Sequence, residues 1–289
     1  MFAVAGRLKQ YLSLIKSLQT GLLLATGMAG YMSTRCPAHS WQTLAGLMGS
    51  LFLAISGSTI LNMWYDRDID RVMNRTHHRP IASGKVSPQN ALRVGLVLSV
   101  LGIGWAVGLG PLYGLIVFAG LFFDVVIYTI WLKRRTCWSI VWGGVSGGMP
   151  ILAGRVLGLQ SLRAAQVDAV GILLVLAILF WIPTHILTFS LRYFEEYRSA
   201  NIPTFPSRYG FIFTRRIIAI SSVLATMWVA TAAVWIQVES GYLHFLALLS
   251  SVLMILALLT VIRPSQRLNV GLFKYASVYM LLAMLLLSI

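Results

Sequence analysis

The sequence predicts an all-α, polytopic membrane protein built as a bundle of nine transmembrane helices. Of its 289 residues, 58% are hydrophobic and only 11% are charged, and the mean hydropathy is +0.80. Apolar runs of about twenty residues separate the charged clusters, and a helix of that length crosses the hydrocarbon core of a bilayer. The basic residues gather in alternate loops. No separate soluble domain is expected, so residues 1–289 form a single domain.

The expected helices follow the apolar runs in order along the chain. Because each run is bounded by charged or turn-forming residues, the number of helices is better defined than their ends. The nine predicted spans are 13–33, 41–62, 89–109, 112–132, 138–157, 167–190, 217–237, 241–262 and 271–289.

The net charge of +15 belongs to the membrane topology and does not indicate nucleic-acid binding, because the basic clusters are separated by apolar spans. With the N-terminus in the cytoplasm, twenty of the 23 Lys and Arg residues lie on the cytoplasmic side. This asymmetry follows the positive-inside rule. The cytoplasmic loops are then 63–88, 133–137, 191–216 and 263–270. The basic residues on the opposite side are Arg35, Arg155 and Arg163.

The first residues contain no recognisable cleavage site and no transit-like leader. We therefore expect a bacterial plasma-membrane protein with several spans. Its N-terminus and its acidic loops are expected in the cytoplasm.

Three of the eight acidic residues, Asp66, Asp68 and Asp70, fall within five positions of one another. If the segment is helical, Asn62, Asp66 and Asp70 form one stripe and Asp68 points elsewhere. Oxygen ligands in such a stripe suit Mg²⁺, which takes one or two carboxylates, several waters and substrate phosphate oxygens. The alternative is that the acids merely balance a basic loop, but that role does not require this spacing.

Cations surround the acidic stripe and could bind the phosphates directly. They are Arg67, Arg71, Arg75, Arg79 and Lys85. A second long loop on the same side carries Glu195 and Glu196 together with further arginines and prolines. Two loops of this kind on one face predict a single site closed from two sides.

The stretch that begins at Asn62 resembles the first aspartate-rich motif of the UbiA-type intramembrane prenyltransferases. It reads NMWYDRDIDRVMNRTHHRP, and the family motif is N-x-x-x-D-x-x-x-D. Its continuation is similar to the protoheme IX farnesyltransferase (haem O synthase) branch. Two further stretches support that branch, YTIWLKRRTCWSIVWGGVSGGMPILAG from Tyr128 and FWIPTHILTFSLRYFEEYRSANIPTFP from Phe180.

The resemblance implies nine helices around a central cavity and Mg²⁺-dependent transfer of an isoprenoid from its diphosphate. In this branch the donor is farnesyl diphosphate and the acceptor is a vinyl group of haem B, which gives haem O for terminal oxidases. The expected partners are these two substrates and membrane lipid. The protein partner to test is a haem-A-forming enzyme or an oxidase assembly.

Departures from the branch fall mainly on the acceptor side. Lys16-Ser17-Leu18 replaces Lys-Pro-Arg before the first helix, and Pro183-Thr184-His185-Ile186 replaces Pro-His-Phe. Glu195-Glu196 stands where the branch has two aspartates. These changes bear on the identity of the acceptor more than on the reaction type.

The expected roles follow from ionisation of an allylic diphosphate, in which a highly charged leaving group must be held. We assign Asn62, Asp66 and Asp70 to one Mg²⁺, and Glu196 with Glu195 to a second. The expected diphosphate contacts are Arg79, Lys85, Lys133 and Arg134. For Lys133 and Arg134, an anchor at the membrane surface is an equally good interpretation.

Three residues inside the predicted spans complete the candidate site. Asp124 lies nine residues before Lys133, which places it ~13 Å below the membrane surface, where an acid needs a cavity or a partner. We expect Asp124 and Tyr128, one turn apart, to line the cavity; the alternative is a hydrogen bond from Asp124 to a neighbouring helix. His185 could bind the acceptor, ligate haem iron or be a satisfied polar residue.

Two other functions compete with haem farnesylation. The first keeps prenyl transfer but uses an aromatic or quinone-precursor acceptor. The second is a non-catalytic carrier of haem or lipid, which should show internal repeats and charge near the midplane. Because the charge lies almost wholly at helix ends on one side, the carrier is the weakest of the three.

Overall fold

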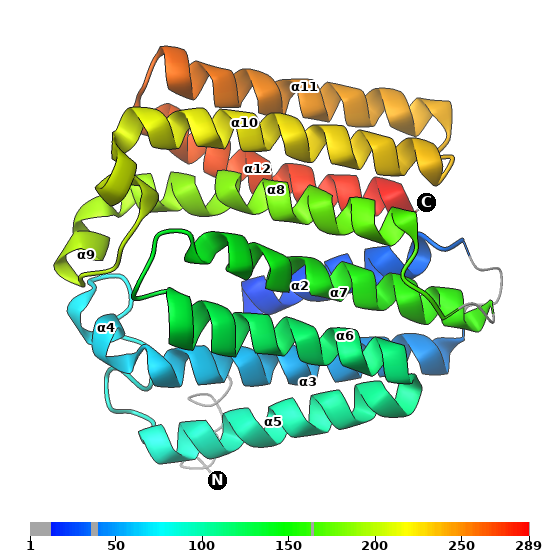
Figure 1. The fold of residues 1–289 in the computed structure, drawn as a ribbon, viewed down its shortest axis with the longest axis horizontal. Helices are drawn as coiled ribbons and strands as arrows, with labels where there is room; N and C mark the ends of the chain where they lie inside the picture. The colour runs from blue at the N-terminus through cyan, green and yellow to red at the C-terminus, as the bar shows by residue number, and fades with distance from the viewer. Residues whose placement is uncertain (1–12, 36–39, 163–164, 289) are drawn as a thin grey trace, which may run out of the picture.

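The computed structural model describes residues 13–35, 40–162 and 165–288, and in that part of the chain every regular element is helical (Figure 1). The elements are α2 (Ser17–Met32), α3 (Trp41–Tyr65), α4 (Arg67–Val72), α5 (Pro88–Leu109), α6 (Pro111–Leu121), η1 (Phe122–Leu132), α7 (Ser139–Ser161), α8 (Ala169–Arg192), α9 (Phe194–Ser199), α10 (Phe205–Trp235), α11 (Ser240–Ile262) and α12 (Gln266–Ser288).

The predicted all-α membrane fold is confirmed. Each of the nine predicted spans corresponds to a helical rod, with α6 and η1 forming one continuous rod. Eight of these rods, within the described residues, are long and apolar enough to cross a membrane. The remaining one, α2, has 16 described residues. Large apolar side chains on the outer faces of α5, α10 and α11 are exposed, as expected for surfaces that contact lipid.

Helix α10 begins twelve residues before the predicted span at 217–237. Its first turn starts with Phe205 and Pro206 and is capped by Thr204, whose hydroxyl accepts a hydrogen bond from the Ser207 N–H. Gly210 then adopts φ 81° and ψ 169° inside the element. A short capped turn therefore precedes the membrane span, and hydropathy alone could not detect it.

The first described rod packs closely on α7 because both carry glycines at their crossing. A Cβ atom on Gly30 would lie 2.0 Å from the Ile151 carbonyl oxygen, and one on Gly154 would lie 1.9 Å from the Gly27 carbonyl oxygen. Small residues allow the backbones of membrane helices to approach in this way. The contact fixes α2 in the interior of the bundle, beside the elements that carry the candidate site.

Successive rods run back and forth, so that their connections collect at the two ends of the bundle (Figure 1). The two long loops, with α4 and α9, lie at one end, and the connection from η1 to α7 lies there as well. This end is the one for which the sequence predicts the twenty basic residues.

A buried arginine joins three rods near the opposite end. The Arg155 guanidinium on α7 donates to both carboxylate oxygens of Asp168, at 2.7 and 2.6 Å, and to the Ser33 carbonyl oxygen at 3.0 Å. Burial raises the pKa of Asp168, but the hydrogen bonds from Arg155 and the Gly171 N–H outweigh it, so the pKa lies below its ordinary value. The pair connects α2, α7 and the start of α8 far from the loop end.

Candidate active site

The acidic stripe lies where α3 passes into α4. The helix is interrupted at Asp66, which has φ −84° and ψ 7°. The i to i+4 backbone bonds nevertheless continue, from the Asp66 N–H to the Asn62 carbonyl at 2.9 Å and from the Asp70 N–H to the Asp66 carbonyl at 2.8 Å. The side chains of Asp66 and Asp70 are 5% and 6% exposed, whereas that of Asp68 is 62% exposed. As predicted, Asp66 and Asp70 share one buried stripe and Asp68 points elsewhere.

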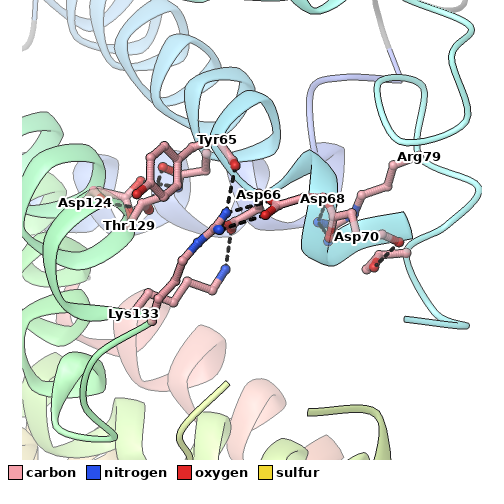
Figure 2. A network of polar contacts seen from close by, with 11 residues as sticks. Tyr65, Asp66, Asp68, Asp70, Arg79, Asp124, Thr129 and Lys133 are labelled. Atoms are coloured by element: carbon pink, nitrogen blue, oxygen red, sulfur yellow. Dashed lines mark hydrogen bonds and ion pairs between the residues drawn. The ribbon is translucent and has the colours of Figure 1, made fainter. Parts of the chain in front are cut away.

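Both buried carboxylates are held by cations from other parts of the chain (Figure 2). The Lys133 ammonium forms an ion pair with Asp66, across 67 residues of sequence. One guanidinium nitrogen of Arg79 donates to both oxygens of Asp70 at 2.8 Å. Burial lowers the pKa of Lys133, but the Asp66 carboxylate outweighs it and holds the pKa above its ordinary range.

Arg134 sits beside this pair at the rim. Its two terminal nitrogens donate to the two oxygens of Asp68 at 2.8 and 2.7 Å, and one of them lies 3.9 Å from Asp66. Its guanidinium also lies 4.7 Å from the centre of the Tyr65 ring. The hydrogen bonds raise the pKa of Arg134 and lower that of Asp68. Arg134 is therefore a positioned group near the buried acids as well as a surface arginine.

Asp124 is bonded to the neighbouring helix α3. Its carboxylate accepts a hydrogen bond from the Asn62 amide at 2.8 Å and another from the Ser58 hydroxyl. The Thr129 hydroxyl contacts the Asn62 amide oxygen and the Asp124 carbonyl oxygen, each at 2.8 Å. The alternative of a helix-to-helix hydrogen bond thus describes these contacts, and a catalytic role for Asp124 stays a prediction.

The element that carries Asp124 is a π-helix, η1. In a π-helix the backbone hydrogen bonds join residues i and i+5, and Thr129, five residues after Asp124, donates its hydroxyl to the Asp124 carbonyl oxygen. Tyr128 lies beside Lys133, whose ammonium is 5.8 Å from the centre of the tyrosine ring. A cavity-lining role for Asp124 and Tyr128 stays a prediction.

The second loop approaches the first through one of its two glutamates. The Glu196 carboxylate accepts a hydrogen bond from the Arg75 backbone N–H at 3.1 Å. Glu195 is 78% exposed and faces Arg198 at 3.9 Å. Ile69 and Met73 of the first loop pack against Ile202 of the second. The two loops are therefore in contact, and Glu196 is the glutamate that faces the first loop.

Two hollows of the described chain bear on the candidate site. One, of about 350 Å³, is lined by residues 191–196 and Phe211 at the loop end. The other is an apolar cavity of about 70 Å³ inside the bundle, bordered by α2, α7, α8 and α12. Trp181 and Ser277 line it, and His185 lies one turn beyond Trp181 on α8. Lys85 is exposed on the loop before α5, and its contact with a diphosphate stays a prediction.

Among the described residues, no three His, Cys, Asp or Glu side chains lie together as a preformed metal cage. One oxygen of Asp66 is buried and accepts no hydrogen bond. A carboxylate with a free buried oxygen, near a second carboxylate, fits Mg²⁺, because this ion uses few protein ligands and completes its shell with water and phosphate. The Asn62 amide, in contrast, is already bonded to Asp124 and Thr129.

Lys16 has the charged groups Arg79, Lys133, Asp124 and Asp70 as electrostatic neighbours, and no role in the site was predicted for it from the sequence. It precedes α2 and is partly buried. Burial, together with the positive charges of Arg79 and Lys133, lowers the pKa of Lys16 to about 8. Ser58 and Thr129 were also missed. Ser58 could have been found, because it lies one helical turn before Asn62 on the same face.

Comparisons with known proteins agree on one family. A model of the UbiA prenyltransferase family matches residues 23–285. A protoheme IX farnesyltransferase of Archaeoglobus fulgidus is 38% identical over 246 residues, which cover 85% of this chain and 84% of the relative. One from Aeropyrum pernix is 33% identical over 279 residues, which cover 94% of this chain and 88% of the relative.

Solved structures share the fold at low sequence identity. A digeranylgeranylglyceryl phosphate synthase matches with a TM-score of 0.80 at 19% identity, covering 98% of both chains. A UbiA homolog from Archaeoglobus fulgidus bound to GPP and Mg²⁺ matches with a TM-score of 0.67 at 15% identity, covering 97% of this chain and 100% of that one. These likenesses extend over nearly the whole chain.

Proposed function

Because the chain belongs to the UbiA prenyltransferase family, we propose that it transfers the farnesyl group of farnesyl diphosphate to a vinyl group of haem B. The product is haem O. The observation that carries the proposal is identity of 38% over 85% of the chain to a protein named protoheme IX farnesyltransferase. The buried pair Asp66 and Asp70, each held by a cation, supports the diphosphate chemistry.

The reaction breaks the allylic carbon–oxygen bond, the vinyl π bond and one O–H bond of water, and it forms one carbon–carbon bond and one carbon–oxygen bond. The allylic carbon–oxygen bond of farnesyl diphosphate breaks, and its electron pair leaves with the diphosphate. The vinyl π-electrons of haem B form a carbon–carbon bond to the allylic carbon, which leaves a cation on the vinyl carbon next to the porphyrin. Water adds to that carbon and loses a proton to solvent, which gives the hydroxyl group of haem O.

The cations at the loop end bind and orient the leaving group. Arg79, Lys133 and Arg134 point at the carboxylates from three directions and are within reach of phosphate oxygens bound between them. Lys16 adds a further positive charge from the start of α2. Charge fixed in place before the bond breaks stabilises the departing diphosphate without reorganisation during the step.

We assign Mg²⁺ to the same place, held by Asp66 and Asp70, with a second ion on the side of Glu196 and, less directly, Glu195. When bound, it neutralises the leaving diphosphate and makes it a better leaving group. Support comes from the free buried oxygen of Asp66 and from the structural relative solved with GPP and Mg²⁺. The Asn62 amide is bonded to Asp124 and Thr129. It would become a Mg²⁺ ligand only if ligand binding broke these hydrogen bonds.

The apolar walls behind the cations protect the electrophile. Trp181 and Phe273 stack on His185, and Phe189 contacts Phe273. Aromatic faces stabilise a nearby cation and exclude water until the carbon–carbon bond has formed. Water then reacts only with the second cation.

We further propose that the loop end is cytoplasmic, because the topology expected from the sequence puts twenty of the 23 basic residues on that side. We also propose that the protein is in a bacterial plasma membrane. Its product would pass to a haem-A-forming enzyme or an oxidase assembly. Surrounding lipid supplies the medium in which both apolar substrates dissolve.

A second acceptor class remains a specific alternative. The sequence departs from the branch at Pro183-Thr184-His185-Ile186 and at Glu195-Glu196, on the acceptor side. A UbiA-type enzyme with an aromatic or quinone-precursor acceptor would keep Asp66, Asp70 and their cations unchanged.

The test is incubation of the detergent-purified protein with Mg²⁺, farnesyl diphosphate and haem B, followed by mass analysis of the extracted porphyrin. A gain of one farnesyl group plus water supports haem O synthesis. The Asp66→Asn variant serves as the inactive control and Asp68→Asn as the matched active one. Unchanged haem, with diphosphate released only when a quinone-precursor fraction is added, would overturn the haem acceptor and keep the family reaction.

A further inference from the structure

The hollow of about 350 Å³ at the loop end is not part of the acidic stripe. Its walls are residues 191–196 and Phe211. These residues belong to the end of α8, to α9 and to the first part of α10. In the described part of the chain, no residue of α3, α4 or η1 lines it. The hollow therefore borders the groups assigned to the reaction only through Glu195 and Glu196.

The hollow lies at the level of the lipid headgroups. The span expected for α8 ends at residue 190 and the span expected for α10 begins at residue 217, so every lining residue lies within six positions of a span end. The headgroup layer is about 5–8 Å thick on each side of the hydrocarbon core. Ile212 and Phe213, which follow Phe211, are exposed and lead into the outer face of α10. A lipid beside α10 therefore places its headgroup next to the hollow.

Two arginines without acidic partners stand at the hollow. Arg192 lines it, and its guanidinium lies 5.1 Å from the centre of the Tyr193 ring. The Arg215 guanidinium lies 5.8 Å from the centre of the Phe211 ring, which forms another wall. Within the described residues, neither guanidinium forms an ion pair or a hydrogen bond. Stacking on an aromatic face leaves the N–H groups of an arginine available to phosphate oxygens.

The same hollow is lined by two carboxylates with unused oxygens. Glu195 is exposed, and its nearest cation, Arg198, is 3.9 Å away, which is too far for a hydrogen bond. Glu196 uses Oε2 to accept the Arg75 N–H at 3.1 Å. Since a carboxylate accepts several hydrogen bonds, both side chains can still bind a donor. The hollow thus presents guanidinium groups, carboxylates and aromatic walls together.

We propose that this hollow binds the headgroup of a membrane phospholipid that carries both a phosphate and a primary ammonium group, as phosphatidylethanolamine does. Arg192 and Arg215 bind the phosphate, and the ammonium donates to Glu195 and Glu196. The volume equals that of about twelve water molecules at ~30 Å³ each, which is enough for the phosphoethanolamine group. An anionic glycerol headgroup leaves the carboxylates without a cation, and a choline headgroup has no N–H to donate.

The test compares lipids that differ only in their headgroups. The full-length protein is placed in phosphatidylcholine nanodiscs that contain a minor fraction of phosphatidylethanolamine or phosphatidylglycerol, and the lipids that stay bound after transfer to detergent are identified by native mass spectrometry. The wild type is expected to retain the ethanolamine lipid about tenfold more often than either other lipid, because charge-assisted hydrogen bonds to both of its charges add to its affinity.

Substitutions separate the two halves of the headgroup site. Arg192→Gln should lower retention of the ethanolamine lipid about tenfold, since it removes a charged phosphate contact. Glu195→Gln combined with Glu196→Gln should abolish the preference for ethanolamine over glycerol headgroups. Arg267→Gln is the matched control, because Arg267 is exposed at the same end of the bundle, on α12, and does not line the hollow. It should retain lipid as the wild type does.

Each other outcome contradicts the proposal. Equal retention of the three lipids, or unchanged retention in Arg192→Gln, overturns the headgroup site. An equal loss in Arg267→Gln shows that net charge alone attracts lipid. A preference for ethanolamine that persists in the double glutamate variant removes the ammonium contact. If soluble phosphoethanolamine binds the delipidated protein as tightly as the lipid, the ligand is a free phosphate ester. Farnesyl transfer is not measured, so these outcomes are independent of the proposed acceptor.

Discussion

The side-chain amide of Asn62 on α3 donates a 2.8 Å hydrogen bond to the carboxylate of Asp124 in η1. The other end of the same amide accepts a hydrogen bond from Thr129. Both groups of Asn62 are thus satisfied by one neighbouring helix. Asn62, the first residue of the acidic motif, is therefore already hydrogen-bonded to Asp124 before any substrate binds.

Thr129→Val should loosen this network, because it leaves the Asn62 amide oxygen without a buried donor. Leaving a buried polar group unsatisfied costs about 1–3 kcal/mol, so the melting temperature and kcat should both fall. Thr129→Ser keeps the hydroxyl and should retain most of both. Differential scanning fluorimetry and farnesyl transfer measure the two effects, and equal behaviour of the two variants would contradict the role of the hydroxyl.

Asp66→Asn and Asp70→Asn should each lower kcat by about 10²–10³-fold or more, the loss typical of removing one preorganised electrostatic group. Each variant should still insert into the membrane as a helical protein. Asp68→Asn removes the same charge two residues from each of the buried acids, but on a side chain that is 62% exposed, and should keep activity within a few-fold. Substantial turnover by either buried-acid variant would remove the metal assignment.

Chelation should stop the reaction reversibly. EDTA is expected to abolish farnesyl transfer, and Mg²⁺ in excess should restore it, because the buried carboxylates and the diphosphate are both negatively charged and a metal cation would neutralise them. Binding of a non-reactive diphosphate analogue, followed by calorimetry, should also become Mg²⁺-dependent. Turnover that continues in EDTA-treated, metal-free protein would contradict this expectation.

The pKa of about 8 for Lys16 predicts a specific alkaline limit. Below this pH the ammonium is charged and can attract the diphosphate. Above it the side chain loses its proton, so kcat/KM for farnesyl diphosphate should decline, since this ratio reports groups of the free enzyme. Lys16→Arg keeps the charge at alkaline pH and should extend the plateau. An identical pH profile for both proteins would exclude Lys16 from substrate binding.

Arg155→Met should destabilise the bundle without touching the chemistry. It leaves the Asp168 carboxylate without its cation, and breaking a largely buried pair costs about 3 kcal/mol. Because the pKa of Asp168 lies below its ordinary value of 3.8, the pair stabilises the wild type above that pH and the contribution is lost as pH falls further. Thermal unfolding against pH should show this decline only in the wild type, with activity per folded molecule unchanged in both.

Much of the fold was predictable because each membrane helix must be apolar over its whole length. The acidic stripe was predictable too, because the i to i+4 bonds persist through the interruption at Asp66. The choice between Glu195 and Glu196 was not, since both lie on the same short helix and only the position of Arg75 distinguishes them.

Two parts of the site depended on information that local sequence does not carry. In the π-helix η1, the Thr129 hydroxyl contacts the Asp124 carbonyl oxygen and the Asn62 amide oxygen, and a pattern read at 3.6 residues per turn does not reveal these contacts. Lys16 approaches Arg79 and Lys133 only after α2 has packed in the bundle. Its neighbours are separated from it by 63 residues or more in the sequence.

The partners of the acidic loop also define an order of assembly during synthesis. Asp70 and its partner Arg79 are nine residues apart, so this pair can form as soon as the first loop leaves the ribosome. The ion pair of Asp66 with Lys133 requires 67 more residues, and the hydrogen bond between Arg75 and Glu196 spans 121 residues. A nascent chain halted before α9 therefore carries two neutralised acids and lacks the contact between the loops. Such a chain can be inserted and charge-balanced in the membrane before it is able to bind its substrates.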